Sequence, residues 1–213
     1  MFCANQLCVC VKFSIFVCDA ACVRQVWQAA CSFNVIVRYS MATIDCVMVR
    51  RYQSPCGELL LGSFGGRLCL CNWAEELHPG RVESRLVRLL RVGFREAASE
   101  VADVAASQLD EYFGGRRRVF TVPLLLVGTA FQRSVWQQLL SVPYGHTVSY
   151  GELARSASRL KAVRAVANAI GANALSVLVP CHRVVGCDGG VTGYAGGVEA
   201  KRFLLGLERR AMP

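Results

Sequence analysis

The chain has 213 residues, of which 54% are hydrophobic and 18% are charged. This composition supports a packed core and excludes a largely disordered chain, and the length allows one large domain or two small ones. The net charge of +9 favours a polyanionic partner such as nucleic acid. A solvated basic surface would give the same charge, so charge alone does not decide the function.

The first forty residues differ from the rest of the chain. They hold six of the 12 cysteines, which are Cys3, Cys8, Cys10, Cys18, Cys22 and Cys31. This density would indicate disulfides in a short secreted chain, but the remaining chain is long, and a reactive thiol favours a reducing, cytoplasmic location. Residues 2–18 make a poor signal peptide or membrane span, because Lys12 interrupts them and no basic segment precedes them. We expect residues 1–40 to be an extension outside the functional fold.

Residues 41–123 predict a small N-terminal α/β domain that opens with strands. Residues 44–54 alternate weakly between apolar and polar side chains, and further strands are predicted at 58–63 and 68–73. Gly65-Gly66 between the last two predicts a hairpin turn. The domain is therefore expected to begin as an antiparallel meander.

A long helical pattern completes this domain. Residues 81–113 carry apolar side chains at the spacing of a helix, with Gly93 as a candidate break. Residues 119–123 then predict a last edge strand. We find no catalytic constellation among these residues.

A zinc site is the one metal centre that this domain suggests. The candidate ligands are Cys46, Cys56, Cys69 and Cys71. Their spacing is not the Cys-x-x-Cys of usual zinc sites, and the only histidine nearby is His78. We therefore expect no metal and no other cofactor.

Residues 124–213 predict a mainly helical C-terminal domain. Residues 131–140 form an amphipathic pattern, and Ser149 with Glu152 three residues later forms a capping box that starts a helix. A second short helix is predicted from about Lys161 to Gly171. Two short helices joined in this way predict a helix-turn-helix.

The second of these helices carries little bulk. Its small side chains are Ala162, Ala165, Ala167 and Ala169. A helix that reads the major groove normally presents several long polar side chains, and here only Lys161 and Arg164 are long and charged. The pattern indicates either tight packing in a small core or a slim helix that enters the minor groove with little sequence readout.

A cysteine motif follows this helix. The apolar run 175–179 predicts a short buried strand, which Pro180 ends, and Cys181, His182 and Arg183 come directly afterwards. A thiol is a nucleophile only as thiolate, and a neighbouring histidine and nearby cations favour that form. The motif is a candidate covalent site, although the Cys181-His182 dipeptide by itself favours a buried structural cysteine, since cysteine is among the residues most often buried.

In order and content, the motifs of the chain resemble those of the methylated-DNA–protein-cysteine methyltransferases, which repair 6-O-alkylguanine by direct reversal. The matching stretches are 149–154, 161–173, 180–184 and 193–197, followed by the helix that ends at Glu208. The resemblance is dense from Phe131 to Glu208 and weaker back to Asp45. It implies an α/β (α+β) fold in which a small sheet-plus-helix domain precedes the helix-turn-helix domain.

The resemblance also implies an activity. The protein would move the alkyl group of 6-O-alkylguanine, and of 4-O-methylthymine, irreversibly onto its own Cys181, with one turnover per molecule. Double-stranded DNA that carries the alkylated guanine would be its partner. A monomer without a membrane or a cofactor is expected.

Single residues receive roles from the same resemblance. Cys181 attacks the alkyl carbon, His182 takes the thiol proton through a water, and Glu208 orients the histidine. Asn173 braces the active-site turn. Tyr150 contacts the flipped base and its phosphate.

The remaining implied residues contact DNA or the extruded base. Arg164 fills the gap in the base stack, for which a planar, charged guanidinium is suited. Further DNA contacts are assigned to Lys161, Ala165 and Arg183. The base pocket is assigned to Val184, Tyr194, Ala195 and Gly196.

Two other classes of protein stay open. A non-catalytic helix-turn-helix regulator or lesion-binding protein would bind DNA but would not require Cys181 beside His182. A thiol hydrolase would use both residues but has no reason for an alanine-rich helix that carries Arg164.

Overall fold

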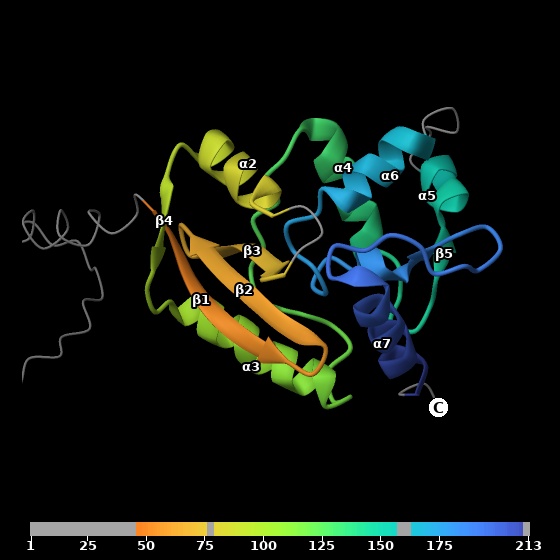
Figure 1. Ribbon diagram of the computed structural model, residues 1–213, viewed down its shortest axis with the longest axis horizontal. Helices are drawn as coiled ribbons and strands as arrows, with labels where there is room; N and C mark the ends of the chain where they lie inside the picture. Colours follow the sequence, from red (N-terminus) through yellow and green to blue (C-terminus); the bar gives the residue numbers. More distant parts are fainter. Residues whose placement is uncertain (1–45, 76–78, 157–162, 211–213) are drawn as a thin grey trace, which may run out of the picture. The chain divides into compact units, whose positions relative to one another are not determined.

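The computed structural model describes residues 46–75, 79–156 and 163–210, whose arrangement is shown in Figure 1. They all belong to one compact unit, Ile44–Pro213. The expected extension at 1–40 lies outside the described residues, and the boundaries proposed between domains stay a prediction. Within the described ranges, no helix is long and apolar enough to cross a membrane.

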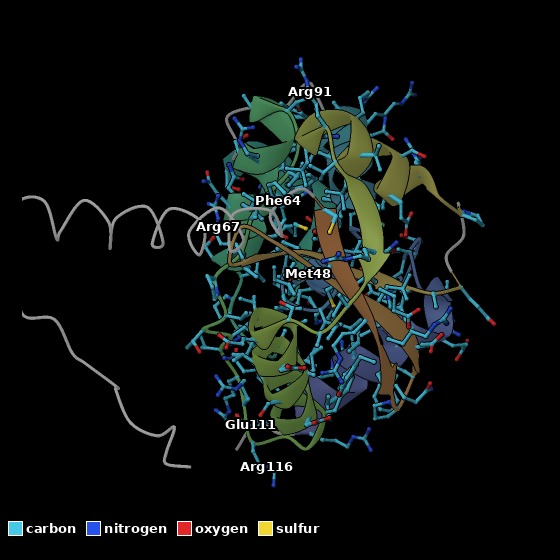
Figure 2. The ribbon with its side chains drawn as sticks, turned by 90° about the vertical axis from the view of Figure 1, so that its left-hand side faces the viewer. Met48, Phe64, Arg67, Arg91, Glu111 and Arg116 are labelled. Atoms are coloured by element: carbon cyan, nitrogen blue, oxygen red, sulfur yellow. The ribbon has the colours of Figure 1, made fainter. Side chains whose placement is uncertain are left out.

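The first half of the described chain, residues 46–123 without 76–78, is built on a four-stranded sheet with the order β3-β2-β1-β4. Strands β1 (Cys46–Ser54), β2 (Gly57–Phe64) and β3 (Arg67–Trp73) form the predicted antiparallel meander. Phe64 and Arg67 flank the predicted hairpin turn (Figure 2). Its Gly65 and Gly66 have φ angles of 56° and 71°, which glycine adopts without strain, so the turn prediction is confirmed.

The fourth strand corrects the prediction of one helical segment at 81–113. Strand β4 (Gly93–Glu96) pairs parallel with β1 and separates α2 (Arg81–Leu90) from α3 (Glu100–Phe113). Arg91 caps the C-terminal end of helix α2 and has a left-handed φ of 58°. The candidate break at Gly93 is the first residue of β4. A four-residue strand between two amphipathic helices leaves the apolar spacing on both sides intact, so the pattern alone did not reveal the strand.

Helix α3 covers the sheet and forms the main core of the first half (Figure 1). Its buried Ala102, Ala105 and Leu109 pack with Leu59 and Leu61 of the sheet. Helix α2 belongs to a second, smaller cluster of buried residues. This packing places the last turn of α3, which carries Tyr112, against Glu208 of the second half of the chain.

The predicted edge strand at 119–123 is wrong. The backbone amides of Thr121 and Val122 donate to the side-chain Oε1 of Gln108, at 2.9 and 3.3 Å, instead of to a neighbouring strand. Pro123 has no amide to donate. Only Leu124 forms an isolated bridge, to Leu68. The segment is therefore an extended connection that a helix side chain holds in place.

The second half is mainly helical, as predicted. Its elements are α4 (Ala130–Leu140), β5 (Val148–Ser149), α5 (Tyr150–Ser156), α6 (Val163–Gly171), the 3-10 turn η2 (Cys181–Arg183), β6 (Val184–Val185) and α7 (Gly197–Arg210). The Ser149–Glu152 capping box is confirmed, because Ser149 N donates to Glu152 Oε2 at 2.7 Å and Glu152 N donates to Ser149 Oγ at 3.1 Å. Helices α5 and α6 pack together as the helix-turn-helix pair.

The apolar run 175–179 is buried but is not a strand. Its single bridge joins Leu175 to Cys71, and Ser176 N donates to Cys71 O at 2.7 Å. Val177 then turns the chain with a left-handed φ of 70°, and Val179 N donates back to Leu175 O at 2.8 Å. The run is therefore a buried turn anchored to strand β3, which leads the chain straight into Cys181.

Candidate active site

Cys181 begins the 3-10 turn η2 and is almost enclosed, with 6% of its surface exposed. Its amide donates to Val179 O at 2.7 Å, which fixes the residue to the buried turn before it. Asn173 Nδ2 donates to Cys181 Sγ at 3.2 Å and to Val179 O at 3.0 Å, and its Oδ1 accepts from Leu175 N at 3.0 Å. One amide side chain thus holds the turn and presents an N–H to the sulfur.

The environment of the sulfur keeps it protonated at rest. Burial raises the pKa of the Cys181 thiol, and this effect outweighs the hydrogen bond from Asn173 and the charge of Lys201, which both lower it. The adjacent histidine and cations therefore do not produce a resting thiolate. A nucleophilic sulfur here needs a base that removes the proton.

His182 has the properties of such a base. It is fully buried, and burial lowers its pKa, so the ring is neutral near pH 7. Its Nε2 lies 2.9 Å from Glu208 Oε1, which fixes the proton on Nε2. Nδ1 has no hydrogen-bond partner among the described residues and keeps its lone pair free.

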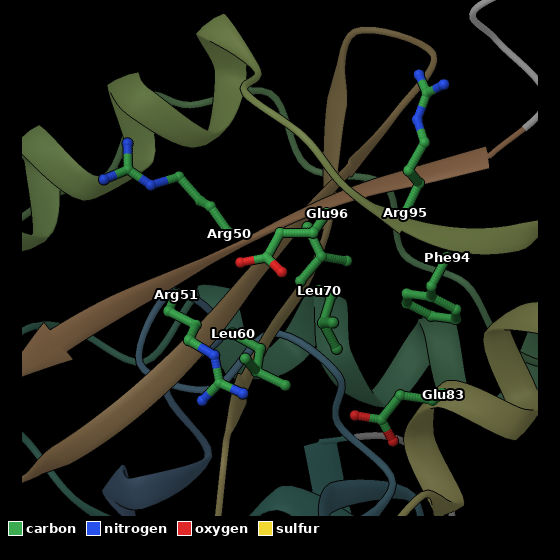
Figure 3. Close-up of a pocket in the computed structure, with 9 residues that line it drawn as sticks. Arg50, Arg51, Leu60, Leu70, Glu83, Phe94, Arg95 and Glu96 are labelled. Atoms are coloured by element: carbon green, nitrogen blue, oxygen red, sulfur yellow. The ribbon is translucent and has the colours of Figure 1, made fainter.

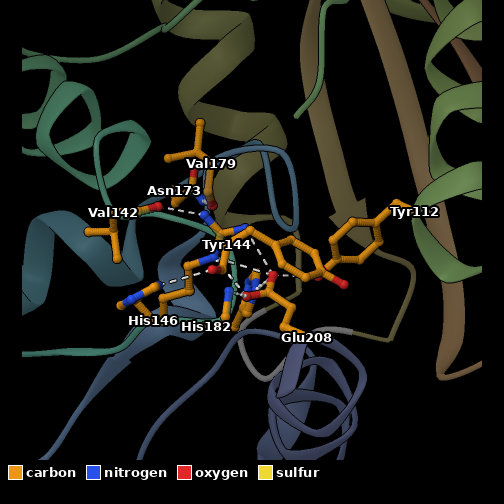
Figure 4. A network of polar contacts seen from close by, with 10 residues as sticks. Tyr112, Val142, Tyr144, His146, Asn173, Val179, His182 and Glu208 are labelled. Atoms are coloured by element: carbon orange, nitrogen blue, oxygen red, sulfur yellow. Dashed lines mark hydrogen bonds and ion pairs between the residues drawn. The ribbon is translucent and has the colours of Figure 1, made fainter. Parts of the chain in front are cut away.

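Glu208 of α7 is the centre of the polar network in Figure 4. Oε1 accepts from His182 and from Tyr112 OH, the latter at 2.7 Å, and Oε2 accepts from Gly145 N at 2.9 Å. Arg183 Nη2 also donates to Oε1, at 2.9 Å. Burial by itself would raise the pKa of Glu208, but the hydrogen bonds from His182 and Arg183 and the charge of Arg183 outweigh it and lower the pKa to about 2, so the carboxylate stays ionised.

Arg183 corrects the expectation that it contacts DNA. Its side chain is buried, and its Nη1 donates to Val142 O at 2.6 Å while its Nε lies 3.0 Å from Glu208 Oε2. The guanidinium therefore faces the interior, where it neutralises the Glu208 carboxylate. A sequence cannot distinguish this position from a solvent-facing arginine beside the cysteine.

A pocket of about 270 Å³ is lined by a neighbour of the thiol, Asn173, although Cys181 itself is not among its lining residues. It is lined by Tyr150, Asn173, Tyr194 and Ala195, together with Ala167, Asn168, Gly171 and Gly193 and with Arg81 and Val82 from the first half. Asn173 lines this space and also donates to Cys181 Sγ, so one side chain links the pocket to the sulfur.

Two residues assigned to the base pocket, Val184 and Gly196, are not among those that line it. The backbone N–H of Val184 donates to Cys181 O and so closes the η2 turn. Gly196 lies against the indole of Trp73, and a Cβ at this position would overlap the ring. Both residues support the pocket from outside, and glycine is needed where the loop meets Trp73.

Helix α6 leads from the pocket to the surface. Arg164 and Ala165 are exposed, whereas Val166, Ala169 and Ile170 are buried. Arg164 lies one turn before Asn168, which lines the pocket, so the two share a face of the helix. Lys161 lies outside the described residues.

Sequence reasoning missed several residues of this site. Lys201 is fully buried, donates to Thr192 O at 2.7 Å and contributes a charge near Cys181, but nothing in its local sequence separates it from an exposed lysine. Arg81, Trp73 and Tyr112 come from the first half, far from the motif in sequence.

The described residues show no group of three or more histidine, cysteine or acidic side chains that could hold a metal ion. Cys46, Cys56, Cys69 and Cys71 are all free thiols. Another pocket, of about 300 Å³, lies over the sheet between β1, β4 and α2 (Figure 3). None of the expected site residues lines it.

A buried thiol with a neutral histidine, beside a helix-turn-helix with an exposed arginine, defines a thiol-dependent enzyme with a nucleic-acid-binding motif. Residues 130–210 match the family described as 6-O-methylguanine DNA methyltransferase, DNA binding domain. Over 142 residues the chain is 50% identical to the inducible methylated-DNA–protein-cysteine methyltransferase of Bacillus subtilis. These aligned residues cover 67% of this chain and 73% of the relative.

Two further comparisons agree. The methylated-DNA–protein-cysteine methyltransferase of Methanosarcina acetivorans is 49% identical over 157 residues, which cover 74% of this chain and 95% of the relative. The crystal structure of Mycobacterium tuberculosis OGT in complex with DNA superposes with a TM-score of 0.67 at 39% identity, covering 78% of this chain and 96% of that chain. The chain belongs to the methylated-DNA–protein-cysteine methyltransferase family, and it is an enzyme of that class, which repairs DNA by alkyl transfer.

The resemblance inferred from the motifs and the mixed α/β fold are thereby confirmed.

Proposed function

We propose that this protein transfers the alkyl group of 6-O-alkylguanine in double-stranded DNA to Cys181. The observation that carries the proposal is the buried series Cys181, His182 and Glu208, in which the carboxylate bonds the neutral histidine next to the thiol. Asn173 donates to Cys181 Sγ and also lines a pocket, so it links the thiol to that space. 4-O-Methylthymine presents the same kind of alkylated oxygen on a smaller base, and we include it as a substrate.

The proposed reaction is a displacement at the alkyl carbon. The Cys181 proton passes through a water to His182 Nδ1, and Glu208 stabilises the resulting imidazolium. The sulfur attacks the carbon, a C–S bond forms, and the C–O bond to guanine breaks. The leaving oxygen takes a proton from the Tyr150 hydroxyl, which His182 then replaces, so the thiol proton ends on guanine.

The product limits the protein to one turnover. An alkyl thioether has no good leaving group, so Cys181 does not return to the thiol. The methylated chain is then spent, and the protein acts as a stoichiometric reagent.

The reacting carbon is accessible only when the nucleotide leaves the base stack, at a cost of a few kcal/mol. Arg164 and Ala165 are exposed on the face of α6 that leads to the pocket, and we propose that Arg164 enters the stack in place of the extruded base. Tyr150 lines the same pocket and would contact that base. The protein is proposed to act on DNA as a monomer.

Intact-mass analysis after incubation with a duplex that holds one 6-O-methylguanine tests the proposal. One added methyl per chain, mapped to Cys181 by peptide sequencing, is expected, with saturation at one equivalent of DNA. DNA binding without any mass gain would instead indicate a lesion-binding protein and would overturn the proposed transfer.

Arg164→Ala is expected to slow transfer from duplex DNA by about tenfold, because the gap in the stack is no longer filled. Transfer from the free 6-O-methylguanine base should not change, since no base is extruded there. Arg155→Ala, on the preceding helix, is the matched control. Equal rates for Arg164→Ala and wild type on the duplex would contradict the assignment.

His182→Asn is expected to change the pH dependence of transfer. In the wild type the neutral imidazole is the reactive form. Because the pKa of His182 is lowered, the transfer rate should not change from neutral pH down into the acid range, where protonation of the imidazole abolishes transfer. The variant should be slow at pH 7 and should accelerate as the pH approaches the raised pKa of Cys181, because hydroxide then ionises the thiol directly.

Single-turnover rates between about pH 5 and 10 measure both profiles. The exposed His146, replaced by asparagine, provides the control and should follow the wild-type profile. A His182→Asn rate that matches the wild type at neutral pH would exclude His182 as the base.

A further inference from the structure

We infer that Tyr112, on helix α3 of the first half, is a positioning residue for the proposed alkyl transfer, because it fixes the Glu208 carboxylate that orients His182. The inference rests on the proposed function. It gives the sheet-and-helix half of the chain an indirect part in the chemistry, through Glu208, although its sequence shows no catalytic constellation.

The contact is a short hydrogen bond between residues that are far apart in the sequence. Tyr112 OH donates to Glu208 Oε1 at 2.7 Å, although the two residues are 96 positions apart. The same oxygen lies 2.9 Å from His182 Nε2. One carboxylate oxygen therefore joins the phenol of the first half to the imidazole beside Cys181 (Figure 4).

The surroundings hold the phenol in this place. Tyr112 and Glu208 are 0% and 1% exposed, so bulk water does not compete for the bond. The ring packs against Phe113, Phe120 and Tyr144 at centroid distances of 5.4, 5.3 and 6.0 Å. Burial and the charge of Glu208 raise the pKa of Tyr112 far above its ordinary value, so its hydroxyl keeps its proton and always donates.

The bond acts on His182 in two ways. It restricts rotation of the carboxylate, which holds the imidazole by Nε2 in the orientation that leaves Nδ1 without a partner among the described residues. It also draws negative charge from Oε1, so Oε1 stabilises the imidazolium less than an unshared oxygen would. Among the described residues, the charged and titratable groups near His182 are Glu208, Arg183, Lys201 and Tyr194, and the Cys181 thiol is adjacent to it in the chain.

Tyr112→Phe removes the hydroxyl and keeps the packed ring. We expect methyl transfer from the 6-O-methylguanine duplex to slow by about tenfold, the order expected when one hydrogen bond to a charged group is lost, with unchanged affinity for DNA. The acid limb of the rate profile should move to higher pH, because the unshared carboxylate oxygen favours protonated His182.

Tyr52→Phe is the matched control. Tyr52 OH donates at 2.8 Å to Asp110 on the same helix α3, a phenol-to-carboxylate bond that does not reach the site. This variant should show the wild-type rate and pH profile. Slowing of both variants to the same extent, or a wild-type rate and profile for Tyr112→Phe, would overturn the inference.

NMR titration of His182 separates this inference from the proposed function. The chain has only three histidines, which simplifies assignment, and the titration does not depend on transfer. A higher His182 pKa in Tyr112→Phe but not in Tyr52→Phe supports the positioning role. If the wild type transferred no methyl, the proposed function would fail, whereas an unchanged His182 titration in Tyr112→Phe would refute the positioning role.

Discussion

Cys181→Ala is expected to abolish methyl transfer and to leave DNA binding intact. The variant lacks the nucleophile, so the rate should fall by at least about 10³-fold, to the level of uncatalysed exchange. The exposed face of α6 does not include Cys181, so affinity for a duplex should stay within about twofold of the wild type. The fold should persist, because Asn173 keeps its bonds to Val179 and Leu175 after the sulfur is removed.

The measurement pairs intact mass with DNA affinity on the same samples. Cys187→Ala is the matched control, since Cys187 is an exposed free thiol six positions along the chain. It should accept one methyl at the wild-type rate. A methyl gained by Cys181→Ala would place the nucleophile at another thiol, and loss of both activities together would indicate unfolding instead.

Glu208→Ala is expected to have the largest effect on stability. The substitution leaves the buried Arg183 guanidinium without its carboxylate and removes the acceptor of Tyr112 OH and Gly145 N. Breaking one side of a buried ion pair costs about 3–5 kcal/mol. The rate of transfer should fall as well, since His182 Nε2 loses its partner.

Urea unfolding gives the free-energy difference. Glu199→Ala on the same helix is the matched control, because Glu199 pairs with Arg202 at 2.6 Å on the exposed surface. That variant should change the free energy of unfolding by less than about 1 kcal/mol. Similar losses for the two variants would show that the buried network contributes no more than a surface pair.

The contribution of Glu208 to stability should also depend on pH. Its pKa is lowered in the folded protein, from an ordinary value of 4.5 to about 2. The stabilisation is therefore complete above about pH 4.5 and is lost as the pH falls towards 2. The difference between wild type and Glu208→Ala should shrink over that range.

Features set by near neighbours in the sequence could be predicted. The Gly65-Gly66 turn, the Ser149–Glu152 capping box and helix α4 each depend on residues within a few positions of one another, and all three are present. The motif around Cys181 was specific enough to indicate the family. Local signals of this kind act through backbone dihedral angles and short-range hydrogen bonds, which the sequence states directly.

Features set by distant partners were predicted wrongly or not at all. An apolar run indicates burial but not backbone conformation, and the prediction of a strand at 175–179 is wrong because the run is a turn anchored to Cys71. Residues 119–123 do not form the predicted strand, because two of their backbone amides donate to Gln108 Oε1 instead of to a neighbouring strand.

Charged side chains near the cysteine show the same limit. The sequence by itself determined the family and the reacting residues, but it offered Arg183 as a DNA contact. Only the tertiary structure decided that its guanidinium turns inward to Glu208, where Tyr112 arrives from 96 positions away. The direction of a long side chain depends on the partner that tertiary packing brings within its reach. The residues next to that side chain in the sequence do not indicate which partner this is.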